Sequence, residues 1–166
     1  DELIRLETTK NLIFYKQCGR EIHIPKRKSH GRYWKLPEKV AVDEDIAKLF
    51  GYYVAEGSVR KIGKNFSNSC YFSFGSHETE KINEVLTLMQ KIFNVQGKVW
   101  QHKNGSETNI SYPTQLGRLF AKYCGFGAEQ KHVPSFIFHS SPSIFQSFLQ
   151  AYLSGDGYVD KRGRSH

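Results

Sequence analysis

The chain has 166 residues, of which 39% are hydrophobic and 14% aromatic, and this composition is typical of one globular domain rather than of a disordered segment. Its 24 lysines and arginines against 16 acidic residues give a net charge of +8, which favours a polyanionic partner, nucleic acid before an anionic membrane surface. No apolar run approaches the roughly 20 residues that a membrane span needs, and no signal-peptide pattern opens the chain, so we expect an intracellular, cytoplasmic protein without a membrane partner.

The first 40 residues form a basic segment. Lysines and arginines cluster at residues 25–28 (PKRK), and Tyr33 and Trp34 lie among further basic residues. Such a mixture suits a surface that follows a nucleic-acid backbone, since cations meet phosphates and rings can stack on bases. A solvated connector with two aromatic anchors explains the same pattern. We therefore assign residues 1–40 as a basic N-terminal segment or connector.

A helix followed by two strands is predicted next. Asp43 can cap a helix that begins beside it, and Gly57 can end that helix, whose buried face includes Ile46. From residue 58 to about residue 75 the sequence changes to β-forming residues, with a turn at residues 63–65 (GKN) between two strands.

The same order then repeats. Ser76 is the expected N-cap of a second helix, whose apolar residues follow one helical face as far as Phe93. A hairpin is predicted for residues 97–112, a third helix ends at Gly125, and a last helix begins near residue 142. This order is α+β: one antiparallel sheet with helices on a single face, the other face being open to solvent or ligand.

Two segments at an interval of 100 residues, 49–57 (LFGYYVAEG) and 149–157 (LQAYLSGDG), end in the same way. In the helices predicted there, small side chains recur at every fourth residue and so form one stripe on each helix. These small residues are Ala47, Gly51 and Ala55 on the first helix and Ser147, Ala151 and Gly155 on the second. Because stripes of small residues let two backbones approach closely, we expect the two helices to pair.

Pairing would bring Glu56 and Asp156, which follow the two stripes, side by side at one end of the pair. Two close carboxylates are typical ligands of a shared divalent metal ion, which also relieves their mutual repulsion. The alternative is that these acids only end their helices. An acid at a helix C-terminus is electrostatically unfavourable, and it occurs here twice, so the pattern favours the metal site.

These two segments resemble the paired signature of the LAGLIDADG homing endonucleases, especially the domain that inteins carry. Residues 131–134 (KHVP) are similar to the Lys-x-Ile/Val-Pro segment that precedes the second motif in inteins. The resemblance covers residues 40–160 and implies an αββαββα half with an antiparallel, DNA-binding saddle sheet and paired motif helices. It assigns residues 41–140 to the first half and residues 141–166 to the start of a second half, truncated after its motif helix.

The resemblance also implies the chemistry, which is metal-dependent, site-specific hydrolysis of both strands of duplex DNA. Glu56 and Asp156 then bind Mg²⁺ and are catalytic, and Lys131 offsets charge on the scissile phosphate. Without the resemblance, Lys131 is an ordinary surface lysine before a proline turn. The sequence departs from the family pattern at Val54, where many members have an acid, and at Glu56, where aspartate is more common.

Duplex DNA is the expected partner, and its contacts are assigned to basic and amide side chains in the first sheet and its loops. Arginine and glutamine can read base edges, whereas lysines mainly neutralise phosphates. The residues assigned are Arg60, Lys61, Lys64, Lys98, Gln101 and Lys103.

Two other functions share this fold. A non-cleaving DNA-binding or RNA-maturase module would keep the basic sheet but would not need two metal-bound acids, so the presence of both acids favours the enzyme. A protein-splicing element would need an N-terminal Cys or Ser nucleophile, a Thr-x-x-His segment and a C-terminal His-Asn, and this sequence shows none of them. We therefore expect the excised or truncated endonuclease portion of an intein, with the host protein of that intein as a further partner.

Overall fold

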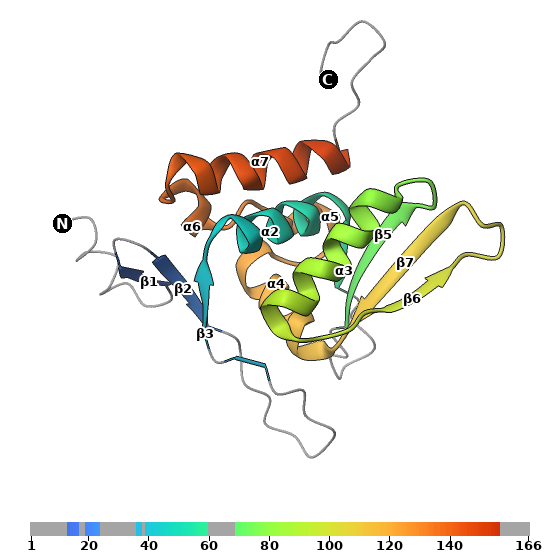
Figure 1. The fold of residues 1–166 in the computed structure, drawn as a ribbon, viewed down its shortest axis with the longest axis horizontal. Helices are drawn as coiled ribbons and strands as arrows, with labels where there is room; N and C mark the ends of the chain where they lie inside the picture. The colour runs from blue at the N-terminus through green and yellow to red at the C-terminus, as the bar shows by residue number, and fades with distance from the viewer. Residues whose placement is uncertain (1–12, 17–18, 24–35, 38, 60–68, 157–166) are drawn as a thin grey trace, which may run out of the picture.

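The computed structural model describes the chain at residues 13–16, 19–23, 36–37, 39–59 and 69–156. Within these ranges a small N-terminal sheet precedes a larger sheet with its helices (Figure 1). From α2 (Glu44–Glu56) onward the order is helix, two strands, helix, two strands, helix, and after two short helices the second motif helix α7 (Pro142–Asp156). The predicted α+β class is therefore confirmed. In the described ranges, no helix combines the length and the hydropathy needed to cross a membrane.

Three short strands precede α2 and form an antiparallel sheet in the order β1-β2-β3. They are β1 (Ile13–Lys16), β2 (Gly19–His23) and β3 (Lys39–Val42). Ile22 and Val42 are buried and join this small sheet to the hydrophobic core. The charge pattern of residues 1–40 predicts no such sheet, because charge density carries no information on strand pairing.

Helix α2 has the limits that its local signals predict. Asp43 caps it, since its Oδ1 accepts a hydrogen bond of 2.9 Å from the backbone N–H of Ile46. At the other end the N–H of Gly57 donates to the carbonyl of Tyr53, and the chain enters β4. A Cβ on Gly57 would lie 2.2 Å from the Tyr53 ring, so the chain can leave the helix this closely only at a glycine.

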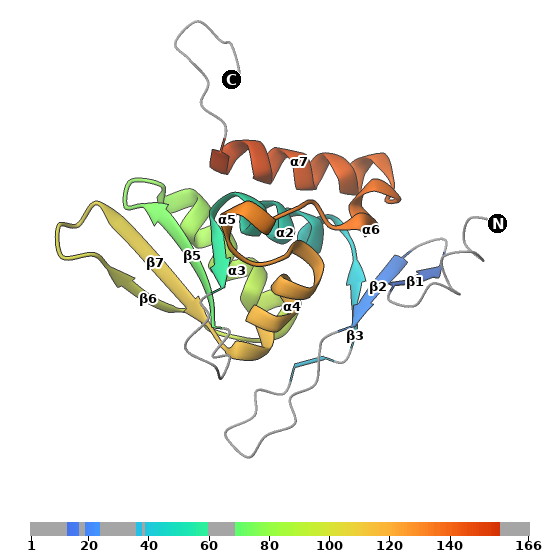
Figure 2. The ribbon, with the colours of Figure 1, turned by 180° about the vertical axis from the view of Figure 1, so that it is seen from behind.

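The larger sheet is antiparallel throughout, with the strand order β4-β5-β7-β6. Its strands are β4 (Gly57–Val59), β5 (Cys70–Gly75), β6 (Lys98–Gln101) and β7 (Glu107–Tyr112). Along β5 and β7, buried residues alternate with half-buried ones, so helices cover one face of the sheet and leave the other open. Figures 1 and 2 show the helices gathered on one side of this sheet.

The predicted N-cap of α3 (Thr79–Phe93) is wrong: Glu78, and not Ser76, precedes the first helical residue. The Ser76 hydroxyl instead forms a 3.1 Å hydrogen bond with the hydroxyl of Thr108 on β7. The chain turns tightly before α3, where the backbone N–H of Glu78 donates to the carbonyl of Gly75. The Ser76 side chain thus bonds to the sheet instead of capping the helix. A local sequence pattern cannot predict this choice, because Thr108 is distant in sequence.

Aromatic rings join the helices to the covered face of the sheet. Tyr53 of α2 stacks on Phe120 of α4 (Thr114–Cys124) with ring centroids 4.4 Å apart, and Phe72 of β5 meets both rings edge-on. Each such pair adds about 0.5–1.5 kcal/mol to the stabilisation from buried area. Two short helices, α5 (Gly127–Gln130) and α6 (Ser135–Phe138), then lead the chain to α7, which lies along α2 (Figure 2).

Candidate active site

Helices α2 and α7 pack side by side and run in the same direction (Figures 1 and 2). A Cβ on Gly51 would lie 2.4 Å from the carbonyl oxygen of Phe148 and 2.9 Å from the Cβ of Ala151. A Cβ on Gly155 would lie 2.5 Å from the Cβ of Ala55. The structure therefore brings Gly51 against Ala151 and Ala55 against Gly155, in the order that the two stripes follow along the sequence.

The first residue of each stripe lies one helical turn before these contacts. Ala47 on α2 is fully buried, and Ser147 on α7 is half-buried. The pairing of α2 with α7 is the most extensive contact between any two described elements. Small residues thus set the distance between two helices whose C-terminal ends lie together.

Glu56 is the last residue of α2, and Asp156 is the last residue of α7. Glu56 is half-buried, and its Oε1 would be 3.4 Å from a Cβ on Gly155, the residue that precedes Asp156. The structure therefore brings the Glu56 carboxylate to the end of α7. The side chain of Asp156 lies outside what the structure describes, so Asp156 is located only by its position as the last residue of α7.

The chemistry at this end of the helix pair suits a cation. Neither motif helix has a basic residue in its last turn, so the negative ends of two helix dipoles coincide with the two acids. In the part of the chain that is described, no three His, Cys, Asp or Glu side chains gather at one place. Two carboxylates still fit Mg²⁺, because this ion is often bound through one or two carboxylates and completes its shell with water and substrate phosphates. Glu56 and Asp156 are the residues that could hold it.

Lys131 lies at the same end of α2, although it is distant from that helix in sequence. Its Nζ donates hydrogen bonds to the carbonyl oxygens of Ala55 (3.2 Å) and Gly57 (3.1 Å), the residues on either side of Glu56. A cation here offsets the negative end of the helix dipole. The structure thus brings Lys131 and Glu56 to one helix end.

The loop that carries Lys131 is shaped by Gly125. This residue has a φ of +81°, which side chains other than glycine rarely adopt, and a Cβ there would lie 2.2 Å from the carbonyl oxygen of Gln130. The loop folds back on the end of α4, where the N–H of His132 donates to the carbonyl of Cys124 at 2.9 Å. This backbone contact fixes the residue next to Lys131 and so directs the lysine to α2.

Two cysteine thiols lie in the core near the site. Burial raises the pKa of the Cys70 thiol, and burial also raises the pKa of the Cys124 thiol against the opposing charge of Lys131. A thiol attacks or binds metal as the thiolate, so protonated, buried thiols are inert. The candidates for chemistry at this site are therefore its carboxylates and its lysine.

The open face of the larger sheet carries polar and aromatic side chains in register. Trp100 pairs with Asn109, and Asn109 pairs with Ser73 on the next strand. Trp100 is 41% exposed and meets the Tyr71 ring edge-on, with centroids 6.0 Å apart. The Ser73 hydroxyl donates to Asn109 Oδ1 at 2.7 Å, and Asn109 Nδ2 donates to Glu107 at 3.0 Å. A search for basic residues misses these polar and aromatic side chains, whereas strand alternation could have found them.

The residues assigned to DNA contacts fall in different places. Lys98 is exposed on β6 and pairs with Ser111, which places it on the open face. Gln101 is exposed but pairs with the buried Thr108, which places it on the opposite face of the edge strand. Lys103 is exposed in the hairpin turn. The remaining three, Arg60, Lys61 and Lys64, lie outside the described residues.

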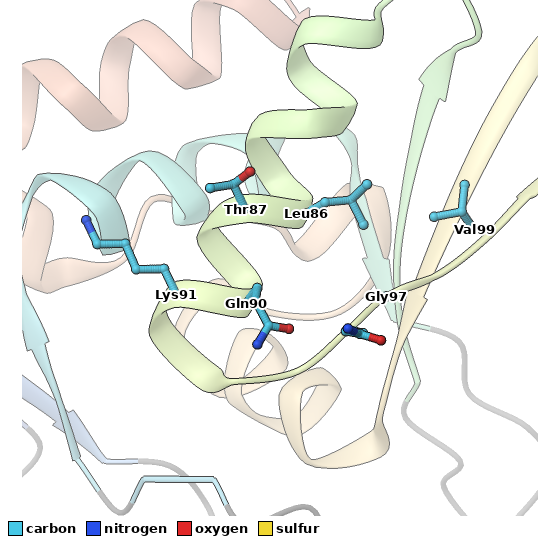
Figure 3. Close-up of a pocket in the computed structure, with 7 residues that line it drawn as sticks. Leu86, Thr87, Gln90, Lys91, Gly97 and Val99 are labelled. Atoms are coloured by element: carbon cyan, nitrogen blue, oxygen red, sulfur yellow. The ribbon is translucent and has the colours of Figure 1, made fainter.

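A groove opens between the second half of α3 and the edge strand β6 (Figure 3). Leu86 and Val99 form its apolar walls, and its volume is about 720 Å³. The other lining residues are Thr87, Gln90, Lys91, Gln96 and Gly97. Neither motif helix contributes to it, so this groove is separate from the candidate active site.

Comparison with known proteins gives matches over most of the chain. A family model described as a LAGLIDADG-like domain matches residues 43–124. A DNA polymerase of Thermococcus kodakarensis is 34% identical over 79% of this chain, which is 8% of the polymerase. An iron-sulfur cluster assembly SufBD family protein of Mycobacterium bovis is 25% identical over 76% of this chain, which is 15% of that protein. The chain thus spans only a small part of the length of these relatives.

Among solved structures, a variant of I-DmoI in complex with its nicked target DNA and manganese is 19% identical, with a TM-score of 0.49 over 70% of this chain and 63% of that chain. The family model matches the range that begins at Asp43, the cap of the first motif helix, and ends with α4, so it includes the whole larger sheet. The resemblance that the two motifs carry is thereby confirmed, and the chain belongs to the LAGLIDADG family of homing endonucleases.

Proposed function

We propose that this chain is a site-specific, Mg²⁺-dependent DNA endonuclease, or part of one. One observation carries the proposal: Gly155 lies against Ala55 and Glu56, which brings the ends of both motif helices to one place. Small residues at this contact let the two helix ends approach closely. Glu56 and Asp156 are the proposed metal ligands, and Lys131 is the proposed catalytic cation.

In this proposal, the carboxylates of Glu56 and Asp156 would hold Mg²⁺. The chemistry that this metal would supply is activation of a water and stabilisation of the attacking and leaving oxygens. The water oxygen bonds to phosphorus as the bond from phosphorus to the leaving oxygen breaks. Lys131 offsets the negative charge that grows on the phosphate, and its hydrogen bonds to Ala55 and Gly57 hold it beside the reacting centre.

The open face of the larger sheet is the proposed DNA-contacting surface. Trp100 and Tyr71 offer flat rings that can pack on sugars or bases, and Asn109 and Ser73 offer hydrogen-bonding groups that can meet base edges. Lys98 adds a cation on the same face, and the net charge of +8 favours a polyanion.

We further propose that this endonuclease belongs to an intein. The matched segment is found in a DNA polymerase and in a SufBD family protein, and it makes up a small share of each. A segment shared by hosts with unrelated tasks is expected of an inserted element. Expression of the complete reading frame should therefore yield a ligated host protein and a free insert, both identified by mass. A host that stays joined to the segment would contradict this part of the proposal.

The endonuclease is tested by incubating the chain with a randomised duplex-DNA library and Mg²⁺, followed by sequencing of the cut ends. We expect a defined double-strand cut that is lost in Glu56→Gln and in Asp156→Asn. The matched control is Glu80→Gln, which removes an exposed carboxylate on α3 and should cleave like the unchanged chain.

The outcome that would overturn cleavage is salt-sensitive duplex binding by the unchanged chain with no cut at any Mg²⁺ concentration. The chain would then act as a non-cleaving DNA-binding module. Tighter binding of structured RNA than of duplex DNA in the same assay would favour the RNA-maturase alternative instead.

A further inference from the structure

Helix α3 reaches the last turn of α7 through one lysine. Lys81 Nζ donates to the carbonyl oxygen of Ser154, which lies two residues before Asp156. The same Nζ is paired with the carboxylate of Glu78 at 2.5 Å. Only 24% of the Lys81 side chain and 20% of the Glu78 side chain are exposed, so this contact is partly shielded from water.

Glu78 is itself held in place by the turn before α3. Its Oε2 accepts a 2.8 Å hydrogen bond from the backbone N–H of Gly75, and its own N–H donates to the Gly75 carbonyl at 2.9 Å. Burial by itself would raise the pKa of Glu78, but the hydrogen bonds from Lys81 and Gly75 outweigh it and leave the pKa below its ordinary value. An ionised carboxylate on a fixed turn therefore fixes the ammonium of Lys81.

At the C-terminal end of each motif helix, a lysine from elsewhere in the chain thus donates to backbone carbonyl oxygens. Lys131 binds the carbonyls of Ala55 and Gly57 at the end of α2, and Lys81 binds the carbonyl of Ser154 at the end of α7. Neither helix carries a basic residue in its own last turn, so in both cases the cation is supplied by a residue outside the helix. Each lysine satisfies a carbonyl that a helix end leaves without an intrahelical partner.

We propose that Lys81 is the positioning residue for Asp156. By binding the Ser154 carbonyl it keeps the last turn of α7 wound, with Gly155 against Glu56 and with Asp156 at a fixed distance from the Glu56 carboxylate. This inference rests on the proposed function, in which both acids hold one metal site. The same turn has a second contact within α7, since the Ser154 hydroxyl donates to the carbonyl of Ala151 at 2.8 Å.

The test compares Lys81→Met with Lys91→Met. Lys91 lies on the same helix and also forms an ion pair, with Asp45, but at the far end from Ser154, so it is a matched control for the loss of one lysine. The first readout is Mn²⁺ affinity, measured by electron paramagnetic resonance on the chain without DNA. The second is hydrogen exchange of residues 149–156.

Loss of a residue that orients metal ligands commonly weakens metal binding by ten- to a hundredfold, so we expect about tenfold weaker Mn²⁺ binding in Lys81→Met. We also expect faster exchange at the end of α7 in this variant, recovery of both in Lys81→Arg, and no change in Lys91→Met.

Equal exchange and equal Mn²⁺ affinity in the two methionine variants would overturn the inference. So would a fall in metal-free DNA affinity with a shallower salt dependence in Lys81→Met, because Lys81 would then be a phosphate contact. Failure of the proposed function has a different signature. The unchanged chain would bind no Mn²⁺, while the exchange difference between Lys81→Met and Lys91→Met would persist.

Discussion

Gly51 lies so close to Phe148 that a Cβ on Gly51 would be 2.4 Å from the Phe148 carbonyl oxygen. Because this oxygen belongs to the backbone of α7, it cannot rotate away as the end of a side chain could. The contact at Gly155 has the opposite arrangement, with the glycine on α7 and Ala55 on α2. Each helix thus contributes one glycine to the interface, and together they set how closely the ends bearing Glu56 and Asp156 approach.

Replacing Gly51 by alanine should therefore destabilise the fold. Alanine favours a helix over glycine by about 1 kcal/mol, but overpacking a close interface costs about 1–3 kcal/mol, and the second effect should prevail where the obstacle is backbone. Urea unfolding of Gly51→Ala should show a lower midpoint than that of the unchanged chain. The control is Gln150→Ala on the exposed side of α7, which should leave the midpoint in place. A Gly51→Ala variant as stable as the control would show that the two helices separate at no cost.

The close helix pair was predictable from sequence because its signal is local and repeated. A stripe of small residues followed by an acid recurs at an interval of 100 residues, and helical periodicity converts that spacing into a shared face. The ends of α2 were predictable for the same reason, since Asp43 and Gly57 act on residues within one turn of themselves. The contacts of Lys81 with α7 and of Lys131 with α2 join residues 73 and 74–76 positions apart, and no local pattern encodes them.

For the open face of the larger sheet, sequence-based prediction is limited by the unknown order of the strands. Its exposed side chains are found from the alternation along β5 and β7, but the register that pairs Trp100 with Asn109 depends on which strands are neighbours. The order β4-β5-β7-β6 puts the two hairpin partners on one side of β5, and sequence alone does not decide that order. The sequence places Gln101 and Lys98 in the same predicted DNA-contacting group, whereas the register separates them onto opposite faces.

Glu84 should make stability depend on pH in acid solution. Burial alone would raise its pKa, but hydrogen bonds from Lys48 and Tyr52 and the charge of Lys48 outweigh burial and lower the pKa below 4.5. A lowered pKa in the folded state contributes stability above pH 4.5, which is lost as the pH falls through the lowered value. Glu84→Gln should therefore melt at a lower temperature than the unchanged chain at about pH 7, and the gap should shrink as the pH falls below 4.5 and through the lowered pKa. Glu80→Gln, on the exposed side of the same helix, should show no such gap, and a gap that is constant with pH would contradict the assignment.

Tyr53→Phe should leave stability unchanged or raise it by about 1 kcal/mol, because a buried hydroxyl without a partner keeps its desolvation penalty. The Tyr53 hydroxyl is buried and has no hydrogen-bond partner among the described residues, and burial raises its pKa. The stacked contact with Phe120 survives the substitution. Tyr52→Phe is the matched variant and should be destabilised, since its hydroxyl donates to Glu84. Urea unfolding of both separates the two cases, and a large loss in Tyr53→Phe would reveal a partner for that hydroxyl.

Trp100→Ala should weaken binding of duplex DNA, because the indole is exposed on the open face beside Tyr71. Removal of a ring that stacks on nucleic acid costs about 1–3 kcal/mol per base, or at least fivefold in affinity. The comparison is Phe138→Ala on α6, which removes an even more exposed ring from outside the sheet. Fluorescence anisotropy in the absence of divalent metal measures both affinities. Equal affinities of the two variants would place the DNA on another surface.

Lys98→Ala should also weaken DNA binding, but in a way that salt concentration reveals. A lysine that neutralises one phosphate releases about one counterion, so its removal should lower the slope of log K against log salt by about 1. Lys98 is exposed on β6 and lies on the same face as Trp100 by register. Lys91→Ala on α3 is the control, since Lys91 borders the groove on the other side of the sheet and is paired with Asp45. If both lysine variants lower the slope equally, the phosphate backbone is recognised by the net charge of the chain and not by the open face. If only Lys98→Ala lowers it, the phosphate contacts are concentrated on the face of the sheet that carries Lys98 and Trp100, and are not spread over a chain whose net charge is +8.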